Sequence, residues 1–288
     1  MIFGDPVPTL SRRFPGRRAF ITGAASGLGL ALAEALASGG WRLGLFDLAE
    51  ARLEQAAAGL RATGVEVWSR AGDVADETVL SAAIRDFAAH SGGLDLLANN
   101  AGVAVAGGID ATSPEDWRWI VGINLLGVVY GCRAAAPLMR AQGGGLILNV
   151  ASSAGFVALP NMAAYNVTKA GVITLSESLE SELADDGVQV TVAMPGFFRT
   201  RLLASIRSPG LERSLAERLM SGSGRDPADA ARALLAAAAR GRRYVVWPPE
   251  YRLLWMFRRW CPNLLQSVLR RLRRRYAAGA PPASGPGS

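Results

Sequence analysis

Lysine and histidine are nearly absent from this chain of 288 residues, which contains one of each, and cysteine occurs only twice. With His90 as the sole histidine, a Ser-His-Asp hydrolase or a His-rich metal centre lacks the residues it needs, so we expect no metal site. Cys132 and Cys261 form neither a disulfide framework nor a metal-binding pattern. We therefore expect two reduced thiols in a reducing compartment.

Two further absences concern location. The N-terminal segment lacks the charged, apolar and small-residue pattern of a signal peptide, and no apolar run approaches the ~18 residues of a membrane span. The sequence predicts a cytoplasmic protein. Only its C-terminal segment offers a route to the inner face of a membrane.

Charge is distributed unevenly along the chain. The net charge is +7, yet residues 1–250 carry 23 basic and 24 acidic residues and are therefore nearly neutral. Residues 251–288 contain no Asp or Glu and eight arginines, at positions 252, 258, 259, 270, 271, 273, 274 and 275. A basic patch confined to one segment does not indicate a nucleic-acid-binding protein, so we expect no nucleic-acid partner.

The rest of the chain alternates between short apolar runs and longer helical patterns. Strands are predicted at 19–22, 42–47, 65–69, 94–99, 146–150, 189–193 and 244–247. Helices are predicted from the first glycine-rich turn to about Ser38, and at 49–62, 76–90, 114–141, 163–185 and 227–239. This alternation predicts an α/β fold, a doubly wound parallel sheet (Rossmann fold) in one catalytic domain over 17–250. Residues 1–16 are expected to form a flexible arm, 251–276 a basic amphipathic helical extension, and 277–288 a disordered terminus.

A glycine-rich segment, Thr22-Gly23-Ala24-Ala25-Ser26-Gly27-Leu28-Gly29, joins the first strand to the first helix. Glycines there permit a tight turn and a close approach of the backbone to phosphate, and the helix N-terminus attracts an anion. Asp47 ends the second strand, where a carboxylate accepts bonds from a ribose and repels a 2′-phosphate. Neither Ser26 nor Leu48 supplies the basic residue that NADP favours, so NAD is the expected cofactor. The alternative for Asp47 is an ordinary turn residue.

Lys169, the one lysine among 31 basic residues, lies four positions after Tyr165. On a helix these positions share a face, so a phenol and an ammonium would be neighbours. The pair suggests a tyrosine acid/base beside a cation, although one chance helical pair is the alternative.

Together these motifs resemble the short-chain dehydrogenase/reductase family, compact branch, from about Arg18 to Trp247. The family's other motifs follow in order: Asp73-Val74, Asn99-Asn100-Ala101-Gly102, Asn124, Ser152, Pro195-Gly196 and Thr200. The resemblance implies catalytic roles for Asn124, Ser152, Tyr165 and Lys169. It implies cofactor contacts from Thr22, Gly23, Ala25, Ser26, Gly27, Leu28, Gly29, Asp47, Asp73, Val74, Asn100, Ala101, Gly102, Tyr165, Lys169, Pro195, Gly196, Phe198 and Thr200.

The family's chemistry gives these residue types distinct roles. A hydride passes between nicotinamide C4 and an alcohol or ketone carbon, with Tyr165 as general acid or base. Lys169 should lower the phenol pKa and hold the ribose, and Ser152 should orient the substrate oxygen. Ser153 is the competing serine, but it alternates to the other side of an extended strand. Asn124 should anchor a water linked to Lys169; the alternative is a satisfied buried amide at a helix irregularity.

The substrate is less defined. Residues 197–224 should form a substrate lid, whose apolar side chains, Ile206 among them, suggest an apolar alcohol or ketone such as a steroid or fatty acyl compound.

The partners are also less defined. The resemblance implies a homodimer or homotetramer that pairs through the Tyr/Lys helix. The extension offers Trp and Phe over 251–260 and a stripe of Leu264, Leu265, Val268, Leu269 and Leu272. It could contact an anionic membrane, or pack on the core or a partner subunit.

Two other classes of function remain open from the sequence. One is a non-catalytic dinucleotide sensor or scaffold, against which the complete Ser152, Tyr165 and Lys169 set argues. The other is a peripheral membrane protein that acts mainly through its basic tail.

Overall fold

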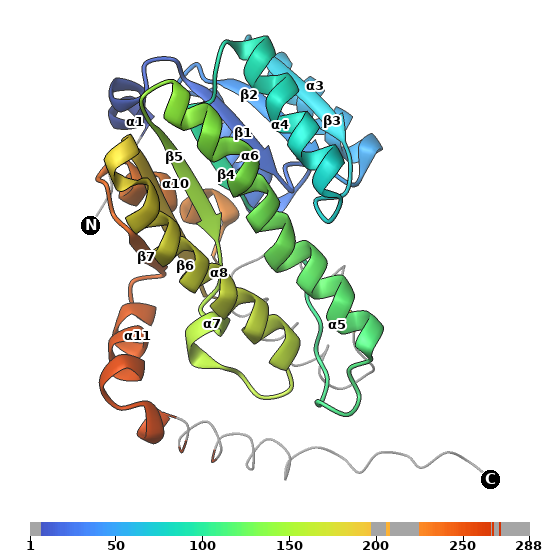
Figure 1. The fold of residues 1–288 in the computed structure, drawn as a ribbon, viewed down its shortest axis with the longest axis vertical. Helices are drawn as coiled ribbons and strands as arrows, with labels where there is room; N and C mark the ends of the chain where they lie inside the picture. Colours follow the sequence, from blue (N-terminus) through green and yellow to red (C-terminus); the bar gives the residue numbers. More distant parts are fainter. Residues whose placement is uncertain (1–6, 197–205, 208–224, 266, 268–270, 272–288) are drawn as a thin grey trace, which may run out of the picture.

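The computed structural model describes residues 7–196, 206–207, 225–265, 267 and 271. Its centre is a seven-stranded parallel sheet in the order β3-β2-β1-β4-β5-β6-β7 (Figure 1). The strands are β1 Arg18–Thr22, β2 Arg42–Asp47, β3 Val67–Ala71, β4 Leu96–Asn99, β5 Gly145–Val150, β6 Val188–Pro195 and β7 Tyr244–Trp247. The predicted doubly wound sheet is confirmed, and all seven predicted strands are present.

Helices cover both faces of the sheet, since alternate side chains of each strand point to opposite faces. Ala19 and Ile21 of β1 pack into one apolar cluster, whereas Phe20 between them packs into the other. The first cluster includes α2 Gly27–Ala37, α3 Glu50–Arg61 and α10 Pro227–Ala239. The second includes α4 Glu77–Ser91, α6 Gly127–Ala141 and α8 Ala163–Leu183, which stand in front of the sheet in Figure 1. Helix α7, Ala154–Val157, and the 3₁₀ turn η2, Ala184–Asp186, are short connections.

The helix bounds follow the predicted patterns closely. Asp226 caps α10 and accepts a bond from the Ala228 amide at 2.8 Å. The helix predicted over 114–141 contains an irregularity: α5 Pro114–Val121 passes through a π-helix, η1 Gly122–Leu126, into α6. The helical stretch Pro114–Ala141 also has a mean hydropathy of 1.4 over an 18-residue window. By length and composition it could span a membrane, although the sequence reading found no apolar run of that length. Half of that window is buried inside the domain, as in a core helix of a globular protein.

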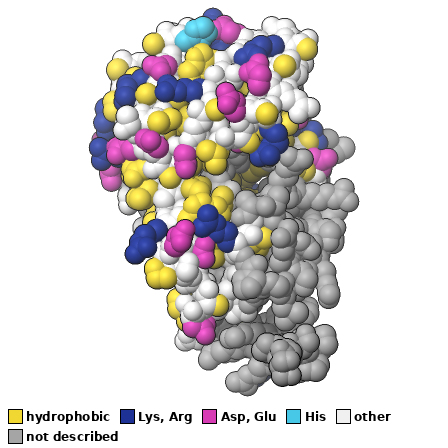
Figure 2. All heavy atoms as spheres, turned by 90° about the vertical axis from the view of Figure 1, so that its right-hand side faces the viewer, with side chains coloured by type: hydrophobic (Ala, Val, Ile, Leu, Met, Phe, Trp, Pro, Cys, Tyr) yellow, Lys and Arg dark blue, Asp and Glu magenta, His cyan; other side chains and the backbone are white. Residues whose placement is uncertain are grey.

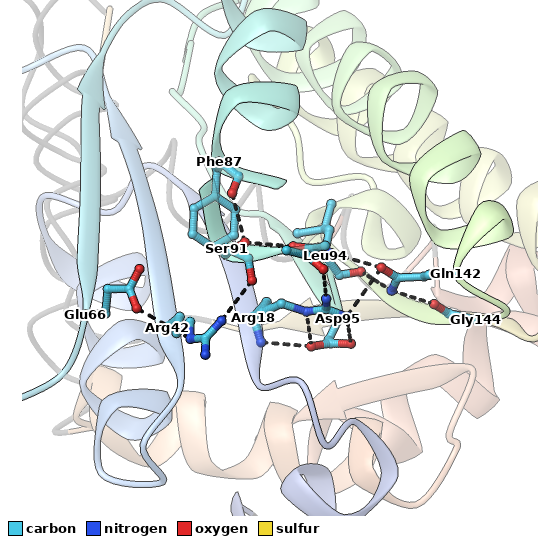
Figure 3. Close-up of polar contacts among 11 residues, drawn as sticks. Arg18, Arg42, Glu66, Phe87, Ser91, Leu94, Asp95, Gln142 and Gly144 are labelled. Carbon is cyan, nitrogen blue, oxygen red and sulfur yellow. Dashed lines mark hydrogen bonds and ion pairs between the residues drawn. The ribbon is translucent and has the colours of Figure 1, made fainter. Parts of the chain in front are cut away.

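A polar clamp closes the sheet at the amino ends of β1 and β4. Arg18 faces Asp95, and its Nε and Nη2 each donate to one carboxylate oxygen at 2.8 Å (Figure 3). Gln142, after α6, donates to the Leu94 carbonyl at 2.7 Å and accepts from the Leu94 amide at 3.1 Å. A bidentate guanidinium–carboxylate pair fixes geometry as well as charge. The amino edge is therefore tied together by structural bonds.

The surface around α3 and α4 carries charges of both signs, interspersed over the face shown in Figure 2. Ion pairs there join Arg61 to Glu54 at 2.6 Å and Arg70 to Asp86 at 2.9 Å. The single histidine, His90, lies 3.0 Å from Glu66 and is half exposed, as expected for a solvated helix end. This pairing agrees with the near-neutral charge of residues 1–250.

The expectation of a flexible arm over 1–16 is wrong for its second half. Residues Val7–Arg13 form a helix, α1, whose Val7 and Leu10 side chains are buried in the core cluster. The Trp41 indole donates to the Ser11 hydroxyl at 3.0 Å, and Arg13 donates to the carbonyls at the end of α10. Seven residues are too few to show a clear helical period, and their burial depends on partners more than 25 positions away.

The extension after residue 250 begins with the helix α11, Tyr251–Trp260. It leaves the end of β7 and packs against β7 and α7 (Figure 1). Helical structure in the predicted extension is thus confirmed for its first part. Leu264 and Leu265 follow within the described residues, whereas Val268, Leu269, Leu272 and the terminus 277–288 lie outside them.

We expect Leu10→Ala to lower the free energy of unfolding by about 2–4 kcal/mol, because the side chain is fully buried between α1 and the core. Urea unfolding followed by far-UV circular dichroism measures the effect. Arg12→Ala, on the exposed face of the same helix, is the matched control and should change stability by less than about 0.5 kcal/mol. Equal, small effects of both substitutions would restore the flexible-arm interpretation.

Candidate active site

The glycine-rich loop lies at the carboxyl edge of the sheet, between β1 and α2. Gly23 has a φ of +66°, and a Cβ there would approach the Ala101 Cα to 2.9 Å. At Gly29 a Cβ would approach the Gly23 carbonyl oxygen to 2.1 Å, so α2 packs against the loop only because this position is glycine. Ser26 precedes the helix in an extended conformation and makes no side-chain capping bond to it. The amino end of α2 is thus presented without a serine cap.

Thr22 and Asn100 join the end of β1 to the end of β4. The Thr22 hydroxyl accepts from the amides of Asn100 at 3.0 Å and Ala101 at 3.1 Å. The Asn100 side-chain amide donates to the carbonyls of Thr22 and Gly23. Asn99, the preceding residue, donates instead to Asn149 on β5 at 2.9 Å. Adjacent strand residues point to opposite faces, so only one of the two asparagines can reach the loop.

Asp47 places its carboxylate beside the glycine-rich loop. One oxygen accepts from the Ala25 amide at 3.0 Å and the other from the Ala49 amide at 2.9 Å. Leu48, next along the chain, is 70% exposed. The Asp47 carboxylate therefore lies near the start of α2. It holds the glycine-rich loop by a hydrogen bond and places a negative charge beside it.

Asp73 and Val74 occupy the loop after β3. The Asp73 carboxylate accepts from the Ala75 amide at 2.9 Å and is otherwise exposed. Val74 is buried against Gly127, where a Cβ would lie 3.1 Å from its side chain. Val74 is thus fixed by packing and leaves the neighbouring carboxylate at the surface.

Tyr165 and Lys169 lie one turn apart on α8 and are both buried, at 7% and 4% exposure. The Lys169 ammonium donates to the Val150 carbonyl at 3.0 Å and lies 5.8 Å from the centroid of the Tyr165 ring. Ser152, two residues beyond that carbonyl, lies close enough to the Tyr165 phenol to lower its pKa. The structure thus brings the three expected residues together around the end of β5. The Val150 acceptor is a backbone group, which no side-chain motif reveals.

Ser153, the competing serine, contributes a backbone contact. It is buried, and its amide donates to the Pro195 carbonyl at 2.8 Å. Ser152, by contrast, accepts from the Ala154 amide at 3.2 Å and reaches the phenol. The geometry favours Ser152, in agreement with the sequence argument.

Pro195 and Gly196 close the site from β6. The Gly196 amide donates to the Trp247 carbonyl at 2.7 Å. A Cβ at Gly196 would approach the Tyr251 ring to 2.6 Å, so the first residue of α11 covers this position. Sequence reasoning missed Tyr251 here, because nothing local connects it to β6. Phe198 and Thr200 lie outside the described residues.

Asn124 lies in the π-helix and is fully buried. Its side chain exchanges two bonds with the Val103 backbone, at 2.8 and 2.9 Å, and donates to the Thr168 hydroxyl at 3.4 Å. A Cβ placed on Gly102 would lie 3.3 Å from the Asn124 Oδ1 and 3.5 Å from the Lys169 Nζ. The helix irregularity therefore aims the amide at the Ala101–Val103 segment and toward Lys169.

These residues fit a nicotinamide dinucleotide. Gly27 has a φ of +56° and open space where a Cβ would stand, so the loop backbone is accessible to a ligand at the amino end of α2. Asp47 lies beside that loop, and across the order reversal between β1 and β4 Ser152 follows the end of β5, with Tyr165 and Lys169 on α8. Such a reversal is where open α/β sheets bind nucleotides.

A family model described as short chain dehydrogenase matches residues 17–210. The chain belongs to the short-chain dehydrogenase/reductase family. Its predicted fold and its predicted enzyme class are thereby confirmed.

Two relatives of this chain carry the names of dehydrogenases that act on alcohols. A 2,5-dichloro-2,5-cyclohexadiene-1,4-diol dehydrogenase of Sphingobium indicum is 33% identical over 236 residues, 82% of this chain and 94% of that protein. A 2-(R)-hydroxypropyl-CoM dehydrogenase of Xanthobacter autotrophicus is 37% identical over 188 residues, 64% of this chain and 75% of that protein. The crystal structure of a short-chain dehydrogenase/reductase from Burkholderia phymatum in complex with NAD has a TM-score of 0.80 and 32% identity. It covers 85% of this chain and 93% of its own.

Burial is the main cause of the pKa shifts of Tyr165 and Lys169. Burial raises the pKa of Tyr165 above its ordinary value of 10, and the nearby Ser152 lowers it in part. The expectation that Lys169 lowers this pKa is not met here, because the ammonium donates to Val150 and not to the phenol oxygen. Burial also lowers the pKa of Lys169 from 10.5 to about 8. Burial therefore shifts both groups toward their neutral forms, although a lysine with a pKa of about 8 is still mostly charged at pH 7.

A buried polar cluster beneath the site was missed by sequence reasoning. Asn149 of β5 accepts from Asn99 and donates to the Ser176 hydroxyl of α8 at 3.0 Å. Cys132 of α6 lies 3.4 Å from the Asn99 amide, and burial raises the pKa of its thiol to about 12. Such a thiol is a packed structural group without nucleophilic character. A polar residue in the apolar run Leu146–Val150 is the signal that could have indicated this cluster.

The segment expected to form the lid is described only at Ile206 and Arg207. Ile206 packs against the small apolar cluster that contains Tyr165, Val105 and Ile120. The Arg207 guanidinium lies 3.8 Å from the centroid of the Trp119 ring and donates to Asp116 at 3.1 Å. These contacts place one point of the segment beside the tyrosine. The remaining residues of the expected lid, 197–205 and 208–224, lie outside the described part of the chain.

Among the described residues, no group of three or more His, Cys, Asp or Glu side chains is arranged to hold a metal ion. The dehydrogenase's site is instead built from a phenol, an ammonium, a hydroxyl and an amide.

We expect the stability difference between wild type and Lys169→Met to change with pH. Above pH 8 the folded protein loses the Lys169 proton that the unfolded chain keeps until about 10.5. The unfolded chain then binds more protons, so wild-type stability rises relative to the variant from pH 8 to 10.5, by up to about 3 kcal/mol.

Urea unfolding of the pair at pH 7, 8, 9 and 10 measures this difference. Methionine keeps the length of the stem and removes only the titrating group. A difference that stays constant over the range would show that the ammonium is not desolvated.

Proposed function

We propose that the protein is an NAD(H)-dependent alcohol dehydrogenase or ketone reductase in which Tyr165 transfers the proton. The observation that carries this proposal is the arrangement of the buried Tyr165 and Lys169 one turn apart on α8, with Ser152 close enough to the phenol to lower its pKa. A sensor that only binds dinucleotide has no need for an acid/base held in this way. The chain's membership in a family of dehydrogenases supports the same conclusion.

The protein's residues would divide the proton chemistry among them. NAD supplies the hydride acceptor, or NADH the donor, when bound. Ser152 donates a hydrogen bond to the substrate oxygen and orients it toward the phenol. Tyr165 keeps its proton at neutral pH because burial raises its pKa, so it is ready to protonate a carbonyl oxygen during reduction. In oxidation Tyr165 would act as the phenolate, which takes the proton of the substrate hydroxyl and becomes a phenol; a charged Lys169 nearby would favour that phenolate through its field, without a bond to the phenol oxygen.

Asn124 would connect Lys169 to a proton path. The Asn124 Oδ1 and the Lys169 Nζ both lie within 3.5 Å of one point beside Gly102. A water bound between these two groups, clear of the Gly102 backbone, would have an acceptor and a donor within reach. Because both N–H groups of the amide are bonded to Val103 and Thr168, the amide oxygen is held in a fixed direction.

The substrate would be an apolar secondary alcohol or ketone. Tyr165 belongs to a cluster with Val105 and Ile120, and Met162 and Ile206 pack against it. An apolar wall beside the acid/base favours a hydrocarbon substituent on the reacting carbon. The relatives named as cyclohexadienediol and hydroxypropyl-CoM dehydrogenases support an alcohol substrate but differ in its size.

Asp47 would select NAD over NADP. Its carboxylate lies next to the glycine-rich loop, and a 2′-phosphate near it would be repelled. The similar structure from Burkholderia phymatum in complex with NAD supports this choice.

We further infer a cytoplasmic homodimer or homotetramer. Helix α8 presents Val167, 52% exposed, on the face opposite the core, and Leu126 of the π-helix is also exposed. Such side chains on the Tyr/Lys helix suit pairing between subunits. Two free thiols suit a reducing compartment.

We expect Tyr165→Phe to lower kcat for an apolar secondary alcohol by about 10²–10⁴-fold, because it removes the proton-transferring oxygen. NADH binding, followed by fluorescence, should survive. The measurement is NADH production from a panel of secondary alcohols that differ in size. Tyr130→Phe, which removes a phenol oxygen from α6, is the matched control and should keep wild-type turnover.

Turnover that persists in Tyr165→Phe would refute the acid/base role. Absence of turnover in the wild type with every alcohol and ketone tested, together with intact NADH binding, would favour the sensor.

We expect wild type to have a higher kcat/KM with NAD⁺ than with NADP⁺. In Asp47→Ser/Leu48→Arg the ratio should shift toward NADP⁺ by about tenfold or more, because a repelling carboxylate is replaced and a cation is added. Leu48 is exposed, so arginine fits there without repacking. Leu48→Gln is the control, since it leaves Asp47 in place and adds no charge. A wild-type preference for NADP⁺ would contradict the cofactor assignment.

A further inference from the structure

Helix α11 has two apolar faces, and one of them packs on the domain. Tyr251 covers Gly196, and the centroid of the Trp255 ring lies 5.2 Å from the centroid of the Tyr244 ring of β7. Leu254 packs against the core cluster, and Arg258 donates to the Phe156 carbonyl of α7 at 3.1 Å. These contacts fix the orientation of the helix. The sequence left open whether the extension contacts a membrane or packs on the core or a partner subunit; this face of α11 packs on the core.

The other face of α11 is exposed. Its large apolar side chains recur at helical spacing and continue one turn beyond the helix: Leu253 (73% exposed), Met256 (51%), Phe257 (37%), Trp260 (82%) and Leu264 (54%). We call these five residues the outer stripe. They are five of the nine large exposed apolar side chains among the described residues, and the other four are scattered over the domain. Four of the five also line one open hollow with Leu254. A contiguous exposed apolar surface of this kind marks an interaction site.

The charged residues within α11 have one sign, and the exposed Glu250 that precedes the helix is paired with Arg225. Arg252 and Arg259, seven residues apart, project from one edge of the stripe and are exposed. Residues 251–288 contain eight arginines and no acidic residue. An apolar face with an exposed tryptophan, bordered by arginines, matches the boundary between acyl chains and anionic headgroups. A protein partner would need an apolar groove with acidic edges, whereas an anionic bilayer offers both properties everywhere on its surface.

We propose that the outer stripe docks this protein on anionic lipid bilayers. Leu253, Phe257 and Trp260 enter the acyl boundary, and the arginines bind lipid phosphates. Helix α11 starts on Gly196 and packs its inner face on α7, which begins two residues after Ser152, so the helix that carries the outer stripe lies beside the candidate active site. If the proposed function holds, an apolar alcohol or ketone dissolved in the bilayer would reach the site from the same side.

Vesicle co-sedimentation of the full chain tests docking without any measure of turnover. The probes are vesicles of phosphatidylcholine with about 30% phosphatidylglycerol, and vesicles of phosphatidylcholine alone. We expect the wild type to sediment with the anionic vesicles and to be released by high salt. Leu253→Asp/Trp260→Asp should lower partitioning by about tenfold or more, since two apolar contacts are replaced by charges that lipid phosphate repels.

Ile109→Asp is the matched control, because Ile109 is 71% exposed and lies far from α11 in the sequence. This variant should partition like wild type. Circular dichroism and the urea midpoint establish that both variants fold.

Three results would overturn the proposal. Wild type could remain in the supernatant with anionic vesicles. The double variant could bind as well as wild type, which would exclude the outer stripe. Light scattering could show an oligomer that only the double variant dissociates, without vesicle binding by wild type; the stripe would then be an interface between copies of this chain. Failure here leaves the proposed dehydrogenase activity intact, and failure of that activity leaves vesicle binding unaffected.

Discussion

The hydrogen bonds between the ends of β1 and β4 are the constraint on which the site depends. Strand order reverses at this point, so the loops after the two strands leave in different directions and open a crevice. Thr22 and Asn100 tie the two strand ends together beneath it. The glycine-rich loop on one side and Gly102 on the other are thereby fixed. Asn124 and Lys169 lie within a few ångströms of Gly102, so the same bonds position both halves of the site.

Burial, more than the pairing of charges, sets the chemistry of Tyr165 and Lys169. Both side chains lie in a dry region at the end of β5, and each is shifted toward its neutral form. Desolvation of a charged group near neutral pH costs folding free energy, and the single bond from Lys169 to the Val150 carbonyl offsets only part of that cost. The only lysine of the chain is thus kept at a position where it destabilises the fold. Such an arrangement is typical of a site that serves function.

The extension after β7 links this site to the surface. Tyr251 and Trp255 attach α11 to the domain, and that attachment leaves Leu253, Phe257 and Trp260 facing outward. A helix that was apolar on one face only would bury that face on the domain and expose a polar one, which would leave no apolar surface for docking. With two apolar faces, α11 is held rigidly beside Gly196 and still offers a surface for docking.

The sequence alone determined the order of strands and helices, the glycine-rich turn, and the Tyr165–Lys169 and Ser152 set, because these depend on periodicity and spacing within short segments. It also predicted that Asn124 belongs with this set. Only the tertiary structure decided that Leu10 and Val7 are buried, that Asn99 bonds to Asn149, that Tyr251 covers Gly196, and that burial raises the pKa of Tyr165. Each of these depends on contacts between residues far apart in the chain. Neither periodicity nor local spacing encodes which distant surfaces meet, or how much water they exclude.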